Sequence, residues 1–172
     1  DSIGFFIGDG GNLINKASIN GKNGTGNMGI YVKSGSISNE GNISIGDSVI
    51  LSSEDFSKNT YSVGIYGENL DKLENTGNME RGKDGRGMLS VENNSEAVNK
   101  GDIISNSENA VGIYLIKSSM RNEGDIVLSG NNSVGIGAGL GSVIKNAGSI
   151  VMDGDSSIGI HANTGSTVIN ES

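Results

Sequence analysis

The sequence predicts an all-β protein, a right-handed parallel β-helix, because two short motifs recur at nearly fixed distances. The second motif follows the first by 10 to 12 residues, and successive copies of the first are 23 to 25 residues apart, except for one step of 35. A period of this size is typical of solenoids. We therefore expect about seven coils of 23–25 residues with three short strands each. The first motif is centred on Gly4, Gly29, Gly64, Gly87, Gly112, Gly135 and Gly159, and the second begins at Asn15, Asn39, Asn75, Asn99, Asn122, Asn146 and Asn170.

The first motif reads as a short strand with one apolar face. In the copy at 111–115, alternation places Val111, Ile113 and Leu115 on the inner face and Gly112 and Tyr114 on the outer face. A turn follows, and then a second strand. The inner column of this second strand stands two residues before each repeated Asn: Leu13, Ile37, Leu73, Ala97, Met120, Ile144 and Val168.

The repeated Asn predicts an asparagine ladder, in which each side-chain amide donates a hydrogen bond to the amide one coil away. Asn also tolerates the left-handed backbone conformation that a sharp bend requires. Its side chain shares the inner face only if the strand bends there, and otherwise it faces outward. The alternative is a functional array of amides that binds a ligand. The ladder consists of Asn15, Asn39, Asn75, Asn99, Asn122, Asn146 and Asn170.

A third strand begins four residues after each Asn. Alternation extends in several repeats to Ile45, Leu128 and Met152. Turns rich in Gly, Ser, Asn and Asp then close the coil. The inner column of this strand is Ile19, Ile43, Met79, Ile103, Ile126 and Ile150.

Composition excludes several classes of function. The net charge of −8 argues against nucleic acid and against an acidic membrane surface, since both attract Lys and Arg. The chain lacks Cys, so it has no disulfides and no thiol nucleophile. It has no apolar run near 18 residues. We interpret residues 1–172 as a single β-helical segment, and as an excerpt of a longer protein whose ends require caps.

One insertion interrupts the period. The long step falls after Ile45, so residues 46–60 form an inserted loop, and insertions in solenoids often lie on the binding face. Glu54, Asp55 and Phe56 at its tip are candidate ligand contacts. The alternative is a decorating loop that packs Phe56 on the rod.

The stretch 80–86 is the most charged turn of the chain, and we expect it to be solvated. Arg86 stands where other repeats have Met, Val or Ile. We expect it to point outward, because a buried unpaired Arg is costly.

An outer column beside the repeated Gly contains further candidates. Exposed aromatic side chains in line can stack on sugars, and they can also simply pack on one another. Its members are Phe6, Tyr31, Tyr66, Leu89, Tyr114, Gly137 and His161, of which Tyr31, Tyr66, Tyr114 and His161 are candidate ligand contacts.

No residue pattern points to catalysis. His161 is the only histidine, and no base is placed to activate a serine. The acids are dispersed over turns, whereas polysaccharide lyases and hydrolases use clustered carboxylates. We expect no enzyme activity, no cofactor and no metal. A β-helical carbohydrate-active enzyme is the rival hypothesis, which close carboxylates on adjacent coils would favour.

The repeats resemble passenger repeats of bacterial type V autotransporters, and their Asn-, Lys- and Ile-rich style is most similar to the giant fusobacterial outer-membrane adhesins. The resemblance covers the whole chain and rests on paired motifs. It implies an exported rod, a monomer at the bacterial surface, tethered by a C-terminal outer-membrane barrel outside this excerpt. Members of the family attach to host cells or other bacteria through protein or glycan receptors. The motifs are Ser-Val-Gly-Ile-Tyr (62–66), Ala-Val-Gly-Ile-Tyr (110–114) and Ser-Ile-Gly-Ile-His (157–161), with Asn-Glu-Gly-Asn-Ile (39–43) and Asn-Glu-Gly-Asp-Ile (122–126).

The leading hypothesis is therefore a non-catalytic segment of a surface adhesin. Stacked coils make a stiff spacer, while the loop and the outer aromatic column contact a host-cell or bacterial receptor. A purely structural stalk whose binding tip lies elsewhere is the third possibility.

Overall fold

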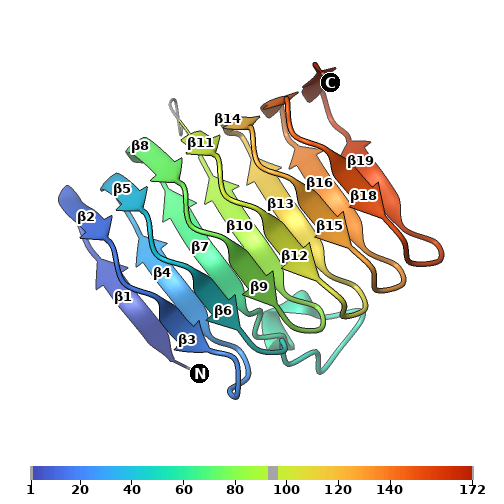
Figure 1. Cartoon of the computed structure of the whole chain (residues 1–172), viewed down its shortest axis with the longest axis horizontal. Coiled ribbons are helices and arrows are strands. Elements are labelled where there is room, and N and C mark those ends of the chain that lie inside the picture. The colour runs from blue at the N-terminus through green and yellow to red at the C-terminus, as the bar shows by residue number, and fades with distance from the viewer. Residues whose placement is uncertain (1, 93–96, 172) are drawn as a thin grey trace.

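The structure, a computed structural model, is a β-solenoid of about seven coils built from three parallel sheets (Figure 1). It describes residues 2–92 and 97–171. The fold class predicted from the period is confirmed. Successive coils lie side by side from the N-terminal to the C-terminal end of the chain; each contributes one strand to the first and second sheets, and the first six also contribute one to the third.

Each sheet collects the strands that occupy the same place in the repeat. The first sheet contains β1 (Ile3–Ile7), β4 (Met28–Val32), β7 (Val63–Glu68), β10 (Arg86–Val91), β13 (Val111–Ile116), β16 (Val134–Gly139) and β19 (Ile158–Ala162). The second contains β2 (Gly11–Asn15), β5 (Gly35–Asn39), β8 (Leu70–Asn75), β11 (Ala97–Asn99), β14 (Ser119–Asn122), β17 (Val143–Asn146) and β20 (Thr167–Asn170). The third contains β3 (Ile19–Gly21), β6 (Ile43–Ile45), β9 (Met79–Arg81), β12 (Ile103–Ser105), β15 (Ile126–Leu128) and β18 (Ile150–Met152).

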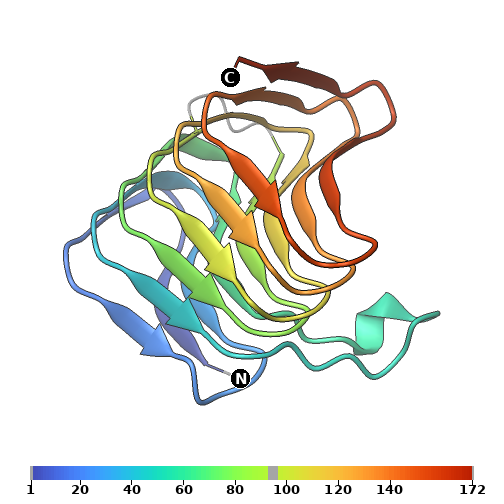
Figure 2. The ribbon, with the colours of Figure 1, turned by 45° about the vertical axis from the view of Figure 1, so that its right-hand side comes forward.

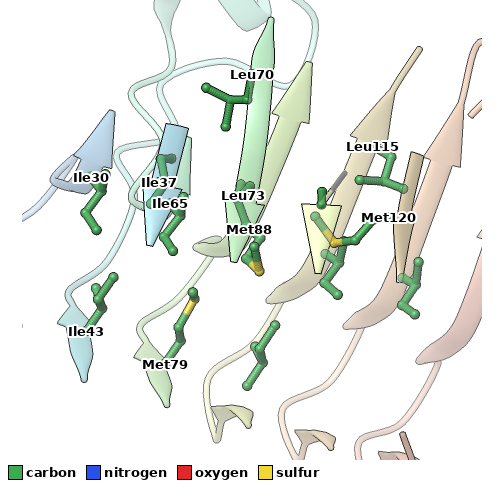
Figure 3. Packing of buried hydrophobic residues seen from close by; sticks show 14 of the residues in the cluster. Ile30, Ile37, Ile43, Ile65, Leu70, Leu73, Met79, Met88, Leu115 and Met120 are labelled. Atoms are coloured by element: carbon green, nitrogen blue, oxygen red, sulfur yellow. The ribbon is translucent and has the colours of Figure 1, made fainter. Parts of the chain in front are cut away.

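The inner columns stack in the predicted register. In the second sheet the column before the repeated Asn pairs Leu13 with Ile37, and the same alignment continues from coil to coil to Val168. In the third sheet Ile103 pairs with Met79 and with Ile126. These side chains fill the interior between the three sheets (Figure 3). No coil buries its apolar face alone, and its neighbours complete the core.

In the inner coils the repeated Gly differs from the prediction, because Gly112 and its equivalents from Gly29 to Gly135 are buried instead of facing outward beside Tyr114. A Cβ built on Gly112 would lie 2.3 Å from the carbonyl oxygen of Gly135 and 3.0 Å from Cγ2 of Ile126. The backbone of the next coil and an inner side chain of the third sheet therefore leave no room for a side chain. Alternation fails at this point of the strand, and close packing of the coils is the reason for the glycine.

Left-handed backbone occurs at two corners of the coil and not at the Asn ladder. None of the seven ladder residues has a positive φ, so the prediction that they supply the left-handed bend is wrong. One corner instead uses Glu92, Lys117, Leu140 and Thr164, and the other uses Asp84, Asn109, Asn132 and Ser156, with φ between 47° and 57°.

The inserted loop projects from one side of the stack, between β6 and β7 (Figure 2). It leaves and returns through an antiparallel pair in which Val49 and Thr60 exchange backbone hydrogen bonds of 2.8 and 2.9 Å. Between them lies a single 3-10 turn, η1 (Phe56–Lys58). The insertion does not disturb the stack, because β4 still pairs with β7 and β6 with β9.

The charged stretch 80–86 is not the solvated turn expected from the sequence. Arg81 is only 3% exposed and stands in the inner column of the third sheet, paired with Ile45. All three of its guanidinium nitrogens are buried without a hydrogen-bond partner. Burial lowers the pKa of Arg81 to about 9. The coil therefore contains a buried charge at a position where Leu128 and Met152 occupy later coils.

Candidate functional site

The Asn ladder lies inside the coil, at the end of each strand of the second sheet. Each Nδ2 donates one hydrogen bond to the Oδ1 of the next ladder residue, with distances of 2.7 to 2.9 Å from Asn15 through to Asn170. The same nitrogen donates a second bond, of 2.7 to 2.8 Å, to the carbonyl oxygen two residues later. Asn75, Asn99, Asn122 and Asn146 have no exposed surface. A buried amide with both hydrogens engaged stabilises the stack and offers nothing to a ligand.

The outer aromatic column stacks in register along the first sheet. Phe6 pairs with Tyr31, Tyr31 with Tyr66 and Tyr114 with Gly137. The rings of Phe6 and Tyr31 meet edge to face at 5.2 Å between centroids, and those of Tyr31 and Tyr66 at 4.8 Å. Such contacts are favourable aromatic packing. These rings therefore cover one another, and only part of each is open to a ligand.

Two tyrosines of this column carry perturbed hydroxyls. The Tyr31 hydroxyl donates to Oε2 of Glu68 at 3.3 Å. Burial, followed by the charge of Glu68, raises the pKa of Tyr31, and the same two causes raise the pKa of Tyr66. Both stay protonated donors at neutral pH.

The other two predicted contacts of the column lie apart from this pair. The Tyr114 ring covers the place of the missing side chain at Gly137, where a Cβ would lie 2.6 Å from its Cδ2. His161 is exposed on β19, beyond Gly137. The column is thus not one continuous aromatic surface, since Leu89 separates Tyr66 from Tyr114.

The inserted loop is held in shape by its own polar side chains. Asn59 Oδ1 accepts from the backbone N–H groups of Leu51 and Ser52 at 2.8 and 3.0 Å, and its Nδ2 donates to the Ser52 carbonyl at 2.8 Å. Ser48 Oγ donates to the Asp84 carbonyl at 2.8 Å and so fixes the base of the loop to the next coil. The loop is therefore a preorganised platform.

At the tip of the loop, the predicted contacts differ in what they leave free. Glu54 is exposed. Asp55 is already engaged, because it accepts from Ser57 and lies 3.4 Å from Lys58 Nζ. The hydrogen bond from Ser57, followed by that from Lys58, lowers the pKa of Asp55. The side chain of Phe56 lies outside the described part of the structure.

The structure adds a pair of residues that sequence reasoning did not bring together, Tyr61 and Arg86. The guanidinium carbon of Arg86 lies 4.0 Å from the centre of the Tyr61 ring and 5.5 Å from that of Tyr114. Arg86 is half-buried and points away from the core, as expected for its outward orientation. Burial lowers the pKa of Arg86, and the two tyrosines oppose that change. Tyr61 follows the insertion directly, so only the path of the loop reveals the contact.

A hollow of about 320 Å³ lies beside this pair, between the loop and the coils. The coils contribute Arg86, Asp84, Val111 and the half-exposed Asn109. The loop contributes Ile50, Ser52, Ser53 and Asn59, and Tyr61 follows it. Its walls therefore combine one cation, one carboxylate, an aromatic ring, two aliphatic side chains and neutral polar groups.

Several of the remaining surface charges form ion pairs. Glu74, for example, lies 2.7 Å from Lys100 and 3.3 Å from Lys72, and the hydrogen bond from Lys100 is the main reason that its pKa is lowered. Within residues 2–92 and 97–171, no group of three or more His, Cys, Asp or Glu side chains is placed to hold a metal ion. In the same part of the chain, no helix has the length and hydrophobicity needed to cross a bilayer.

Comparison with known protein families, with curated proteins and with solved structures finds no match for this chain. The class of protein that fold and surface define is a β-solenoid with a single preorganised side loop.

Proposed function

We propose that the chain is a non-catalytic segment of a bacterial surface adhesin, similar in design to an autotransporter passenger, that attaches cells to a host-cell or bacterial receptor. The observation that carries the proposal is the combination of an uninterrupted stack with one ordered insertion on its side. A stack held by an internal amide ladder is a stiff spacer. A loop on a rigid scaffold is a common place for binding residues.

The charge distribution supports a binding role over a catalytic one. A lyase or hydrolase of this fold would require acids that act together on adjacent coils. Several carboxylates here instead pair with lysines on separate turns, as Glu74 does with Lys100 and Glu108 with Lys83. The proposed mechanism is therefore interfacial, with a monomeric rod at the cell surface and no cofactor.

A cell-attachment assay with the isolated chain tests the proposal. Beads coated with the 172-residue chain should adhere to host epithelial cells or to partner bacteria, and the soluble chain should compete. The test variant replaces residues 50–59 with Asn-Gly. Val49 and Thr60 already face each other as a hydrogen-bonded pair, and a two-residue turn closes such a pair. We expect the variant to fold and to lose most of the attachment.

A second variant separates the loop from the aromatic column. Tyr66→Ala with Tyr114→Ala removes the exposed parts of two rings while leaving the loop intact. If attachment survives both changes, the chain binds its receptor through residues other than the inserted loop and the aromatic column. If the wild-type chain binds no cell type, the adhesin proposal is wrong.

A further inference from the structure

We propose that the hollow between the inserted loop and the coils binds an acidic saccharide, with the sugar carboxylate paired to Arg86. The inference deepens the proposed function, since it names a ligand class for the binding face. It rests on the geometry of Arg86, Tyr61 and Asp84. Three features support it: Arg86 has no carboxylate partner, its position is fixed, and polar side chains line the hollow beside it.

Arg86 is a cation without a carboxylate partner in an acidic protein. The groups that act on its charge are the rings of Tyr61 and Tyr114, and among the described residues no carboxylate is within ion-pair distance. Arg121, by contrast, is engaged by Glu123 at 2.9 Å and by Glu171 at 2.7 Å. A guanidinium carries five N–H donors in a planar fork that matches a carboxylate. Arg86 therefore has unused donors at the wall of the hollow.

The position of Arg86 is fixed before a ligand arrives. Tyr61 lies under its guanidinium at 4.0 Å, within the range of cation–π attraction. Arg86 belongs to strand β10, where its backbone pairs with Val63 on one side and Val111 on the other. An arginine held in this way loses little freedom on binding, and preorganisation of this kind increases affinity.

The polar side chains that line the hollow beside Arg86 suit a ligand rich in hydroxyl groups. Asp84 can accept hydrogen bonds from hydroxyls, and its backbone is fixed by the bond from Ser48 to its carbonyl oxygen. The Asn109 side chain and the hydroxyls of Ser52 and Ser53 add neutral donors and acceptors. A ligand must therefore present its negative charge to Arg86 and its hydroxyls to Asp84. A sugar acid meets both conditions, because it has one carboxylate and several hydroxyls on a compact ring.

The size of the hollow also fits a small ligand. Its volume of about 320 Å³ is near the lower end of the range of about 300–1,000 Å³ for small-molecule sites. The floor is preorganised by Asn59, which makes three hydrogen bonds to the loop backbone. One or two sugar residues at the end of a glycan would occupy it.

A titration followed by NMR of the ¹⁵N-labelled 172-residue chain tests the inference, with three probes. They are 3′-sialyllactose, a glucuronic-acid disaccharide and neutral lactose. At least one acidic probe should shift the signals of Arg86, Asp84 and Asn109, and lactose should bind at least about tenfold more weakly. The two acidic probes distinguish a sialic acid from a uronic acid as the source of the carboxylate.

Variants assign the effect to Arg86. Arg86→Gln should weaken the acidic probe by about 10- to 100-fold, as expected for loss of a charge-assisted pair. Arg121→Gln, the matched control on another turn, should leave the titration unchanged. If Arg86→Gln lowers the thermal midpoint, Arg86→Lys serves as the second variant, because it keeps the positive charge over Tyr61 but lacks the planar fork, and it should still weaken the acidic probe.

The inference is overturned if neither acidic probe shifts these signals, if lactose binds equally well, or if Arg86→Gln binds as the wild type does. Its failure is distinct from failure of the adhesin proposal. If cell attachment persists in Arg86→Gln, the saccharide proposal is rejected and the adhesin proposal is kept. If the acidic probe binds but the chain attaches to no cell, the saccharide proposal is kept and the adhesin proposal is rejected.

Discussion

Replacing the buried Arg81 should stabilise the solenoid. The side chain stands in an inner column next to Ile45, and its guanidinium nitrogens have no hydrogen-bond partner. Met152 occupies the same column two coils beyond Ser105, so Arg81→Met introduces a side chain that the column already accepts. The change removes an uncompensated buried charge, which proteins tolerate only at a cost.

The size of the effect follows from the pKa. Burial lowers the pKa of Arg81 from the much higher value of an arginine in water to about 9. At about 1.4 kcal/mol for each tenfold change in proton affinity, this difference corresponds to roughly 5 kcal/mol. Replacing buried ionic groups by apolar side chains of similar volume stabilises proteins by about 1–4 kcal/mol. We therefore expect Arg81→Met to raise the free energy of unfolding by about 3–5 kcal/mol at pH 7.

The same argument predicts a pH dependence with a definite sign. Below pH 9 the folded and unfolded chains both carry the proton on Arg81, so the wild type bears the full penalty. Above pH 9 the folded chain releases this proton and the unfolded chain keeps it, so the stability of the wild type rises with pH. The advantage of Arg81→Met should therefore shrink by about 1 kcal/mol between pH 9 and pH 10.

Urea unfolding followed by circular dichroism at pH 7, 9 and 10 measures both effects. Lys83→Met is the control, because Lys83 lies two residues away and its ion pair with Glu108, at 3.3 Å, is exposed. That change should alter stability by no more than about 1 kcal/mol. Tyr and Lys titrations common to all variants cancel in the differences. The reasoning is refuted if Arg81→Met is no more stable than the wild type at pH 7, or if its advantage is independent of pH.

Two further predictions concern the ladder and the repeated glycine. Asn99→Ala removes bonds to Asn75, Gly101 and Asn122 and should destabilise the chain by about 3–5 kcal/mol in urea unfolding. Its control is an Ala substitution of the exposed Asn78, which accepts one 2.9 Å bond from a backbone N–H and should cost about 1 kcal/mol or less; equal losses would contradict the ladder argument. Gly112→Ala places a Cβ 2.3 Å from a backbone oxygen and should lower stability by about 2–4 kcal/mol. In a Gly8→Ala control the Cβ would lie no closer than 4.0 Å to any neighbour, the Phe6 ring, and the change should have little effect, so a neutral Gly112→Ala result would contradict the packing account.

The inner columns were predictable because burial repeats with the coil. Leu13, Ile37 and their equivalents occupy one position of the period, and stacking brings equal positions together in any solenoid. The hydrogen bonds between the Asn side chains were predictable from the same regularity. The inward direction of these side chains was not predictable, because it depends on where each strand of the second sheet ends.

The corrections arise where backbone geometry overrides residue preference. Leu140 and Thr164 adopt the left-handed conformation that sequence rules assign to Asn or Gly, since their corner is set by the two strands it joins. A signal for Arg81 was present, because it stands two residues after the inner Met79, in the position of Ile45. The high charge of the stretch 80–86 favoured a solvated turn and so outweighed this two-residue spacing.

The contact between Tyr61 and Arg86 had no sequence signal. It depends on the path of residues 46–60, which no periodic rule describes. The hollow beside it therefore became visible only from the position of the loop against the coils.

The amide ladder gives the rod a direction. Every rung from Asn39 to Asn146 donates to the coil that follows it in sequence and accepts from the coil before it, as Asn75 does toward Asn99 and from Asn39. In a coil of the opposite orientation, the Asn amide N–H would face the N–H of its neighbour instead of an acceptor. The solenoid can therefore be lengthened or shortened only by whole coils in the same orientation. Extra residues within a coil must project outside the ladder. The 35-residue step obeys this condition, because Asn39 and Asn75 still meet at 2.7 Å across it.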